Sequence, residues 1–366
     1  MAAAQPAASR DLSRETAPQR FVALDAFRGF IMILLASEGF GFAFLRNNPT
    51  WDRVASWFDH VPWQGAVFWD MIQPSFMFMA GVALPYALAR RTAEGATFHD
   101  NMRHVLVRAA KLIILSEILI WVSANQIKPQ LINVLAQLAF TYALSFLIMQ
   151  ARFRWQVVIA AGLLAGWTAL LFAFPGPDGP FSKTGSVGLQ FDRLIFHYDY
   201  DPAYSTLNFI PSTVWTLSGV WAGMLFRSQR THAERLKILA ACMMGAFAVG
   251  LGLSPWIPMI KQLCTASFIL YSLGWVLFML IGFYCVVEIL GYRRWTFPLL
   301  VVGMNSIFIY SLSMLLHGWL NRAVAVFTRG FTWIGTLAPV AQSCAVLAVM
   351  WCACYWLYRR KIFLKL

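Results

Sequence analysis

Residues 265–290 read TASFILYSLGWVLFMLIGFYCVVEIL, in which Glu288 is the only charged side chain. A helix needs about 20 predominantly apolar residues to cross the hydrocarbon core of a bilayer, and this run is long enough. Similar runs extend along the chain, and together they make ten candidate spans: residues 21–45, 67–89, 105–123, 131–150, 155–174, 207–226, 237–253, 265–290, 297–317 and 332–357. The sequence therefore predicts an all-α, polytopic membrane helical bundle with about 10 transmembrane helices.

The composition of the whole chain supports a membrane protein. Of its 366 residues, 59% are hydrophobic and 12% are charged, whereas soluble domains have about 25% charged residues. One water-facing core cannot hide so much apolar surface. The composition excludes a soluble enzyme, a nucleic-acid-binding protein and a disordered chain.

The basic charge gives the chain an orientation. The net charge of +13 comes from 29 Lys and Arg residues against 16 Asp and Glu residues. Cytoplasmic loops of membrane proteins are enriched in Lys and Arg. Most of these basic residues fall in inner loops if the N-terminus is cytoplasmic, which predicts that both termini are cytoplasmic. The basic residues left for the outer side are Arg46, Arg53, Lys128, Lys183, Arg193, Lys261, Arg322 and Arg329.

The spans define the domain organisation. The polar residues 1–20 predict a disordered cytoplasmic tail without a cleavable signal peptide. A single transmembrane domain covers residues 21–358, and a basic cytoplasmic C-terminus covers residues 359–366. Two long outer loops, residues 46–66 and 175–206, suggest a functional surface. The six cysteines form no metal-binding pattern, so we expect no metal site.

Ionisable side chains inside spans are costly and mark candidate functional sites. Asp25 and Arg28 lie three residues apart in the first span, so they share one helix face. They form either a local ion pair that anchors the helix or a site in which Asp25 holds Arg28 toward a phosphate. Glu117 and Glu288 can be explained by nearby basic groups.

The densest group of functional candidates lies in residues 59–81, DHVPWQGAVFWDMIQPSFMFMAG. His60 precedes a Pro-Trp turn, and Asp70 follows inside the second span. A neutral imidazole oriented by a carboxylate can accept a proton from an amine or hydroxyl, or carry an acyl group itself. Pro74 is expected to bend the helix and expose backbone groups. The alternative is a loop histidine with no catalytic role.

A polar stripe runs along residues 303–317, GMNSIFIYSLSMLLH. It contains Asn305 and Tyr310, and His317 lies at its outer end. Hydrogen bonds between helices explain such stripes, and contact with a sugar is the alternative.

Three motifs together resemble the heparan-α-glucosaminide N-acetyltransferase family. They are LDAFRGF at residues 24–30, the run from His60 through Trp63, Gly65 and Asp70 to PSFMFMAG, and the FP…VVGMNSIFIY run at residues 297–310. The segment SFILYSLGW at residues 267–275 fits as well, so the resemblance covers about residues 21–317.

The resemblance implies a transmembrane acyltransferase domain that passes an acetyl group from cytoplasmic acetyl-CoA to an amino sugar on the other side. It implies that His60 is the active-site histidine, Asp70 the following aspartate, and Asn305 the asparagine of the family's Asn-Ser pair. Family members carry Asn at the outer end of the first span, where this chain has Ser37 and Glu38.

The two substrates are expected at opposite ends of the bundle. Sugars favour aromatic and carboxylate-lined pockets, and the residues expected to bind the acceptor are Glu38, Ser37, Trp63, Trp69, Tyr310 and His317. Acetyl-CoA carries several negative charges, and its expected site consists of Asp25, Arg28, Arg90, Arg91, Arg108, Arg293 and Arg294. For most of these arginines, topology and anionic lipid are the alternative explanation.

We therefore expect membrane lipid, acetyl-CoA and an amino sugar or glycan as partners, no nucleic acid, and leave a homodimer open. The expected location is a bacterial inner membrane with the active-site mouth on the extracytoplasmic side. The alternatives are a sugar or lipid-linked glycan transporter without acyl transfer, and an O-acyltransferase acting on cell-envelope glycans. Acyl transfer requires a passage by which a thioester arriving from the cytoplasm can reach His60.

Overall fold

The computed structural model describes residues 21–197, 203–328 and 331–364. The predicted tail 1–20, part of the second outer loop and the last two residues lie outside the described residues. The described residues form helices and no β-strand. The α-helices are α1 (Val22–Ala36), α2 (Asp52–Ala55), α3 (Ile72–Ala93), α4 (Phe98–Ala124), α5 (Val134–Ile148), α6 (Phe153–Ala173), α7 (Val187–Phe196), α8 (Phe209–Arg227), α9 (His232–Leu253), α10 (Ala266–Tyr284), α11 (Phe297–Gly303), α12 (Ser306–Thr328) and α13 (Ala338–Arg359).

Short 3-10 or π-helical segments extend several of these helices: η1 (Gly39–Leu45), η2 (Phe68–Met71), η3 (Thr206–Asn208), η4 (Cys285–Ile289), η5 (Arg294–Thr296) and η6 (Phe331–Leu337). Each of the ten predicted spans coincides with one helical segment or with two consecutive ones. Among the described residues, 7 helices are long and apolar enough to cross a membrane, or 8 if the bent pair around α11 and α12 is one span. The chain is thus an integral membrane protein, whereas the number of ten spans and the cytoplasmic termini remain predictions.

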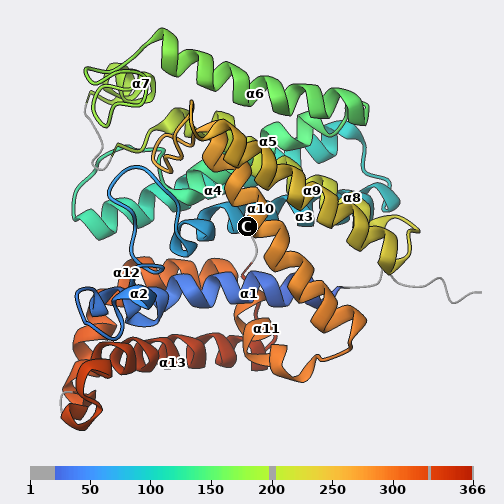
Figure 1. Cartoon of the computed structure of the whole chain (residues 1–366). Coiled ribbons are helices and arrows are strands. Elements are labelled where there is room, and N and C mark those ends of the chain that lie inside the picture. The colour runs from blue at the N-terminus through green and yellow to red at the C-terminus, as the bar shows by residue number, and fades with distance from the viewer. Residues whose placement is uncertain (1–20, 198–202, 329–330, 365–366) are drawn as a thin grey trace, which may run out of the picture.

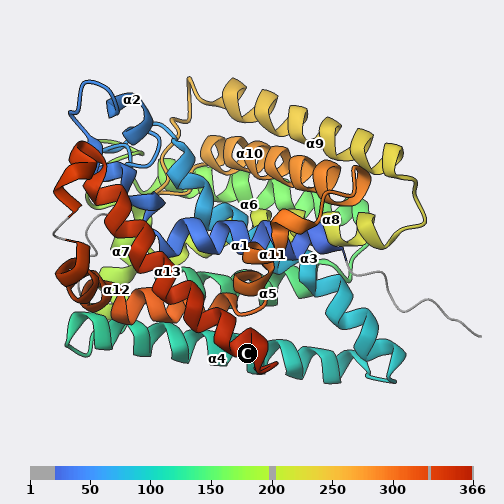
Figure 2. The same ribbon diagram turned by 90° about the horizontal axis from the view of Figure 1, so that it is seen from below.

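The two remaining predicted spans correspond to α4 and α5. Helix α5 has 15 residues, and α4 carries several charged residues along its 27. Figures 1 and 2 nevertheless show α4 running alongside the other long helices. Both views place α2 and α7 at one end of the bundle, here called the outer end, and the turn between α8 and α9 at the opposite, inner end.

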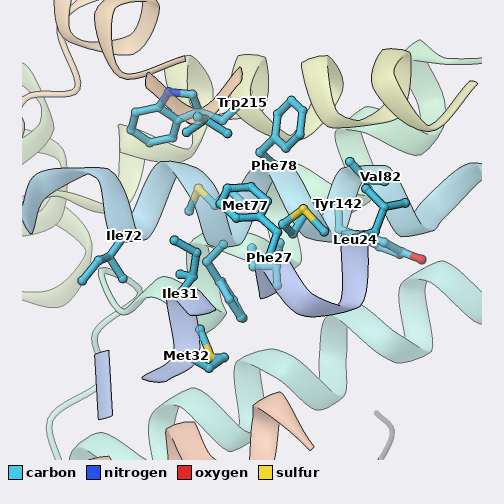
Figure 3. Packing of buried hydrophobic residues seen from close by; sticks show 14 of the residues in the cluster. Leu24, Phe27, Ile31, Met32, Ile72, Met77, Phe78, Val82, Tyr142 and Trp215 are labelled. Atoms are coloured by element: carbon cyan, nitrogen blue, oxygen red, sulfur yellow. The ribbon is translucent and has the colours of Figure 1, made fainter. Parts of the chain in front are cut away.

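The core lies where α1, α3, α5 and α8 meet (Figure 3). Helices α3 and α8 approach each other through a pair of glycines. A Cβ atom on Gly81 would lie 1.9 Å from the carbonyl oxygen of Thr216, and one on Gly219 would lie 2.0 Å from that of Phe78. Only residues without a side chain allow this approach. The close contact holds α3, which begins directly after Asp70, firmly in the bundle.

Candidate active site

His60 and Asp70 form a hydrogen-bonded pair near the outer end. His60 lies in the loop before η2, and Asp70 lies in η2 at the start of the α3 span. His60 Nδ1 is 2.6 Å from Asp70 Oδ1, and Asp70 Oδ2 accepts a hydrogen bond from the Val67 backbone N–H at 3.0 Å. Since a carboxylate can only accept, Nδ1 carries the proton, and Nε2 of the neutral ring keeps its lone pair.

The two members of this pair differ in exposure. The Asp70 side chain is 1% exposed, whereas the His60 side chain is 46% exposed. The carboxylate is thus fixed inside the protein while the ring remains accessible to a substrate. Pro74 occupies the first turn of α3, where no backbone N–H is needed, so the expected bend and exposed backbone groups do not arise there.

Lys261 is the third charged residue of this group, and it comes from the loop between α9 and α10. Its Nζ lies 3.2 Å from Asp70 Oδ1 and 3.4 Å from each ring nitrogen of His60. The Lys261 side chain is 12% exposed. Burial lowers the pKa of its ammonium group, and the neighbouring Asp70 carboxylate opposes this shift.

A cavity of about 350 Å³, here called the outer cavity, opens beside His60 and Lys261. Its other polar lining residues are Trp69, Gln73, Gln130, Asn133, Tyr204 and Tyr310. Asn133 Oδ1 accepts hydrogen bonds from the Tyr310 hydroxyl at 3.0 Å and from the Leu135 N–H at 2.9 Å. Its amide nitrogen is therefore the group left to donate to a ligand. Neutral polar and aromatic groups of this kind suit a sugar.

The six residues predicted to bind the acceptor divide into three pairs. Trp69 and Tyr310 line the outer cavity, and the Trp69 ring centroid lies 6.4 Å from that of His60. Glu38 and His317 pair with each other at 3.1 Å, away from the cavity lining.

Ser37 and Trp63 have structural hydrogen bonds instead. The Ser37 hydroxyl donates to the Leu34 carbonyl at 3.0 Å and accepts from the Phe40 N–H at 3.1 Å. The indole of Trp63 donates to the Phe181 carbonyl at 3.1 Å, which ties the two outer loops together.

The structure does not bring Asn305 to His60. Asn305 is fully buried at the break between α11 and α12. Its amide donates to the Ile362 carbonyl at 3.3 Å and accepts from the Leu364 N–H at 3.1 Å. Both ends of the amide hold the C-terminal segment, so Asn305 is left out of the catalytic group.

A second cavity, here called the inner cavity, lies toward the other end of the bundle. Its volume is about 540 Å³, and its lining includes Asp25, Arg28, Arg90 and Arg227. Asp25 and Arg28 form the expected pair, with 3.8 Å between Oδ1 and Nη1. The inner cavity thus combines several cations with an apolar floor, a combination suited to a nucleotide.

A small middle cavity of about 110 Å³ lies between these two. It shares Phe76 with the lining of the outer cavity. With the inner cavity it shares Arg28 and Ala83. The three cavities therefore form a series from the basic inner end to His60.

The other arginines expected near acetyl-CoA are spread over the inner half. Arg108 lines the middle cavity and donates to the Tyr142 hydroxyl at 3.1 Å. Arg91 donates to Asn101 Oδ1 at 3.0 Å and so braces α4. Arg293 pairs with Glu288 at 2.9 Å. Arg91, Arg293 and the exposed Arg294 do not line any of the three cavities.

Four further site candidates are not marked by any motif in the sequence: Lys261, Asn133, Tyr204 and Arg227. For Lys261, the charge pattern predicted only a position on the outer side. Its apolar surroundings, WIPMIKQLCTASF at residues 256–268, were the available signal, because a lone lysine in such a run is costly unless it has a partner. Among the described residues, no group of three or more His, Cys, Asp or Glu residues could hold a metal ion.

Two curated proteins resemble the chain along most of its length. The human heparan-alpha-glucosaminide N-acetyltransferase is 25% identical over 95% of the chain, and its mouse counterpart is 23% identical over 81%. The chain is related to these acetyltransferases at the family level. It spans 60% of the length of the human acetyltransferase and 54% of the mouse one. No family model matches the chain.

Proposed function

We propose that the protein is a transmembrane acyltransferase that passes an acetyl group from acetyl-CoA at the inner end to an amino sugar or glycan at the outer end. The observation that carries this proposal is the series of three cavities between the inner arginines and His60. The thin pantetheine arm of acetyl-CoA would thread through the middle cavity. An enzyme that bound both substrates at the same end of the bundle would need no series of cavities through the protein.

In this proposal, residues at the inner end bind acetyl-CoA, and residues at the outer end carry out the acetyl transfer. Arg28, Arg90 and Arg227 bind the phosphates of the nucleotide, because guanidinium groups match phosphate oxygens. Asp70 fixes the His60 ring with Nε2 toward the outer cavity. On one route, Nε2 takes the proton of the attacking acceptor. On the other route, Nε2 bonds the acetyl carbon and then passes the acetyl group to the acceptor. Both routes need the same ring orientation.

The outer cavity would hold the acceptor sugar. Trp69 offers an aromatic face, and Gln73, Asn133 and Tyr204 offer hydrogen-bonding groups. The two relatives are N-acetyltransferases, which points to an amino group as the acceptor.

The test uses proteoliposomes with labelled acetyl-CoA on one side and glucosamine on the other. We expect label in the sugar, and we expect His60→Ala to lower turnover by roughly 10²- to 10⁴-fold. His99→Ala is the matched control, because His99 is an exposed histidine near the start of α4. Undiminished turnover by His60→Ala would overturn the assignment, and sugar uptake without acetyl transfer would indicate a transporter.

A further inference from the structure

We propose that Lys261 belongs to the catalytic group, where its ammonium keeps the His60 ring unprotonated and stabilises the oxyanion formed during acyl transfer. This inference rests on the proposed function. It adds a residue that neither the motifs nor the resemblance had pointed to. Its basis is the placement of a nearly buried cation between the catalytic pair and the outer cavity.

The position of the ammonium is the first argument. Lys261 Nζ lies 3.4 Å from both Nδ1 and Nε2 of His60, so it is close to Nε2, the nitrogen that would react. A positive charge at this distance in a poorly solvated site disfavours a second positive charge on the ring. It thus opposes the Asp70 carboxylate, which lies 2.6 Å from Nδ1 and favours a charged ring.

The second argument is the absence of competing charge. Lys261 is the one lysine or arginine among the described residues that line the outer cavity. The titratable groups that face it and His60 are Asp70, Tyr204 and Cys264. Burial raises the pKa of the Tyr204 hydroxyl and raises the pKa of the Cys264 thiol to about 12, so both stay neutral. Asp70 and Lys261 thus set the local field.

The third argument is that the Lys261 backbone is held from two sides. The Met259 carbonyl accepts a hydrogen bond from the Gly65 N–H at 2.8 Å, which joins the lysine loop to the loop of His60. The Gln262 carbonyl accepts one from the Asn208 amide at 2.8 Å. A long, flexible side chain on a fixed backbone, with its head held by Asp70, is preorganised for electrostatic stabilisation.

The chemistry is balanced without a further reactant. On the direct route, the acceptor amine gives a proton to His60 Nε2 as its nitrogen bonds the thioester carbonyl carbon, and the carbonyl electron pair moves onto oxygen. Lys261 donates a hydrogen bond to this oxyanion without giving up its proton. When the oxyanion collapses, the carbon–sulfur bond breaks, and the departing thiolate takes the proton that His60 holds. Lys261 and His60 then return to their starting states.

The first test compares Lys261→Met with Lys261→Arg. We expect Lys261→Met to lower kcat by about 100-fold and to change KM for acetyl-CoA by less than about twofold. Lys261→Arg keeps the positive charge, so we expect its kcat to be at least about tenfold higher than that of Lys261→Met. Lys183→Met, on the exposed outer loop, is the matched control. A Met variant as active as the wild type would overturn the proposal.

The second test needs no turnover. Diethyl pyrocarbonate modifies only unprotonated imidazole, so the pH dependence of His60 labelling, read by mass spectrometry, reports protonation. We expect the labelling midpoint to move up by about one pH unit in Lys261→Met and to stay in place in Lys261→Arg.

The outcomes of the two tests separate the proposals. An unmoved midpoint in a Met variant that unfolds at the wild-type temperature would show that Lys261 does not control the protonation of His60 and would overturn that part of the proposal. If the wild-type protein transfers no acetyl group, acyl transfer itself fails. The midpoint then still decides whether Lys261 controls the protonation of His60.

Discussion

The charged residues beside His60 and those that line the inner cavity differ in exposure and in the distance to their partners. At the outer end, Asp70 is 1% exposed and Lys261 is 12% exposed, and the two lie 3.2 Å apart. At the inner end, Arg28 is 28% exposed and Arg90 is 76% exposed, with acidic partners 3.8 and 3.6 Å away. The charges beside His60 are thus enclosed and closely paired, whereas Arg28 and Arg90, which line the inner cavity, are more exposed.

This difference matches two different tasks. Charges in a poorly solvated site act strongly on a neighbouring reaction but are costly unless they are paired. Open charges act weakly on any one atom but attract a polyanion from solution. Under the proposed function, the outer end would carry out the chemistry and the inner end would capture acetyl-CoA, so we expect mutations at the two ends to affect different kinetic constants.

The largest effect is expected at the outer end, from Asp70→Asn. The Asn side chain no longer fixes the His60 tautomer, so we expect kcat to fall on the order of 1,000-fold. The change also leaves Lys261 without its carboxylate, which should destabilise the protein by about 3 kcal/mol or more. Acetyl transfer and thermal unfolding measure the two effects.

A double variant separates these two effects. Asp70→Asn/Lys261→Met removes both charges, so we expect the unfolding temperature to return most of the way to the wild-type value while activity stays low. Asp52→Asn, which removes an exposed carboxylate paired with Arg46, is the control for the substitution itself. Recovery of activity together with stability would show that Asp70 serves folding alone.

The sequence predicted the helical bundle and the candidate pair of His60 and Asp70, but not the full set of neighbours of this pair. Long apolar runs determine helices locally, and the spacing of His60 and Asp70 is contained in one segment, so both could be found without a structure. Lys261 lies 201 residues from His60 in the chain, and only the packing of α10 and its preceding loop joins them. The resemblance implied a catalytic role for Asn305, and only the packing shows that the segment after α13 holds its amide.

A smaller effect is expected from closing the path between the two ends. Ala83 is half-buried in α3 and lines both the middle and the inner cavity. Ala83→Trp should fill that space and lower acetyl transfer from acetyl-CoA on the order of 10- to 100-fold, because the thioester can no longer reach the ring in the required position. Ala165→Trp, on the exposed face of α6, is the matched control.

A short donor tests whether Ala83→Trp blocks the path or damages the site. The acetyl thioester of N-acetylcysteamine, supplied from the outer side, can enter the outer cavity directly. We expect the Trp variant to use this donor at nearly the wild-type rate. A variant that uses acetyl-CoA as well as the wild type would show that the thioester reaches His60 by another path.

The smallest effect is expected at the open inner end, where two neighbouring arginines provide a matched pair. Arg90 lines the inner cavity, whereas Arg91 donates to Asn101 on α4. We expect Arg90→Gln to raise KM for acetyl-CoA by about three- to fivefold with kcat unchanged, because an exposed charge contributes modestly to binding. The increase should shrink at high salt, where the wild-type attraction is screened as well. Arg91→Gln removes the same charge one residue away and should leave KM unchanged. An equal rise of KM in both variants would mean that the inner arginines attract acetyl-CoA through the overall electrostatic potential and that Arg90 makes no contact with a phosphate.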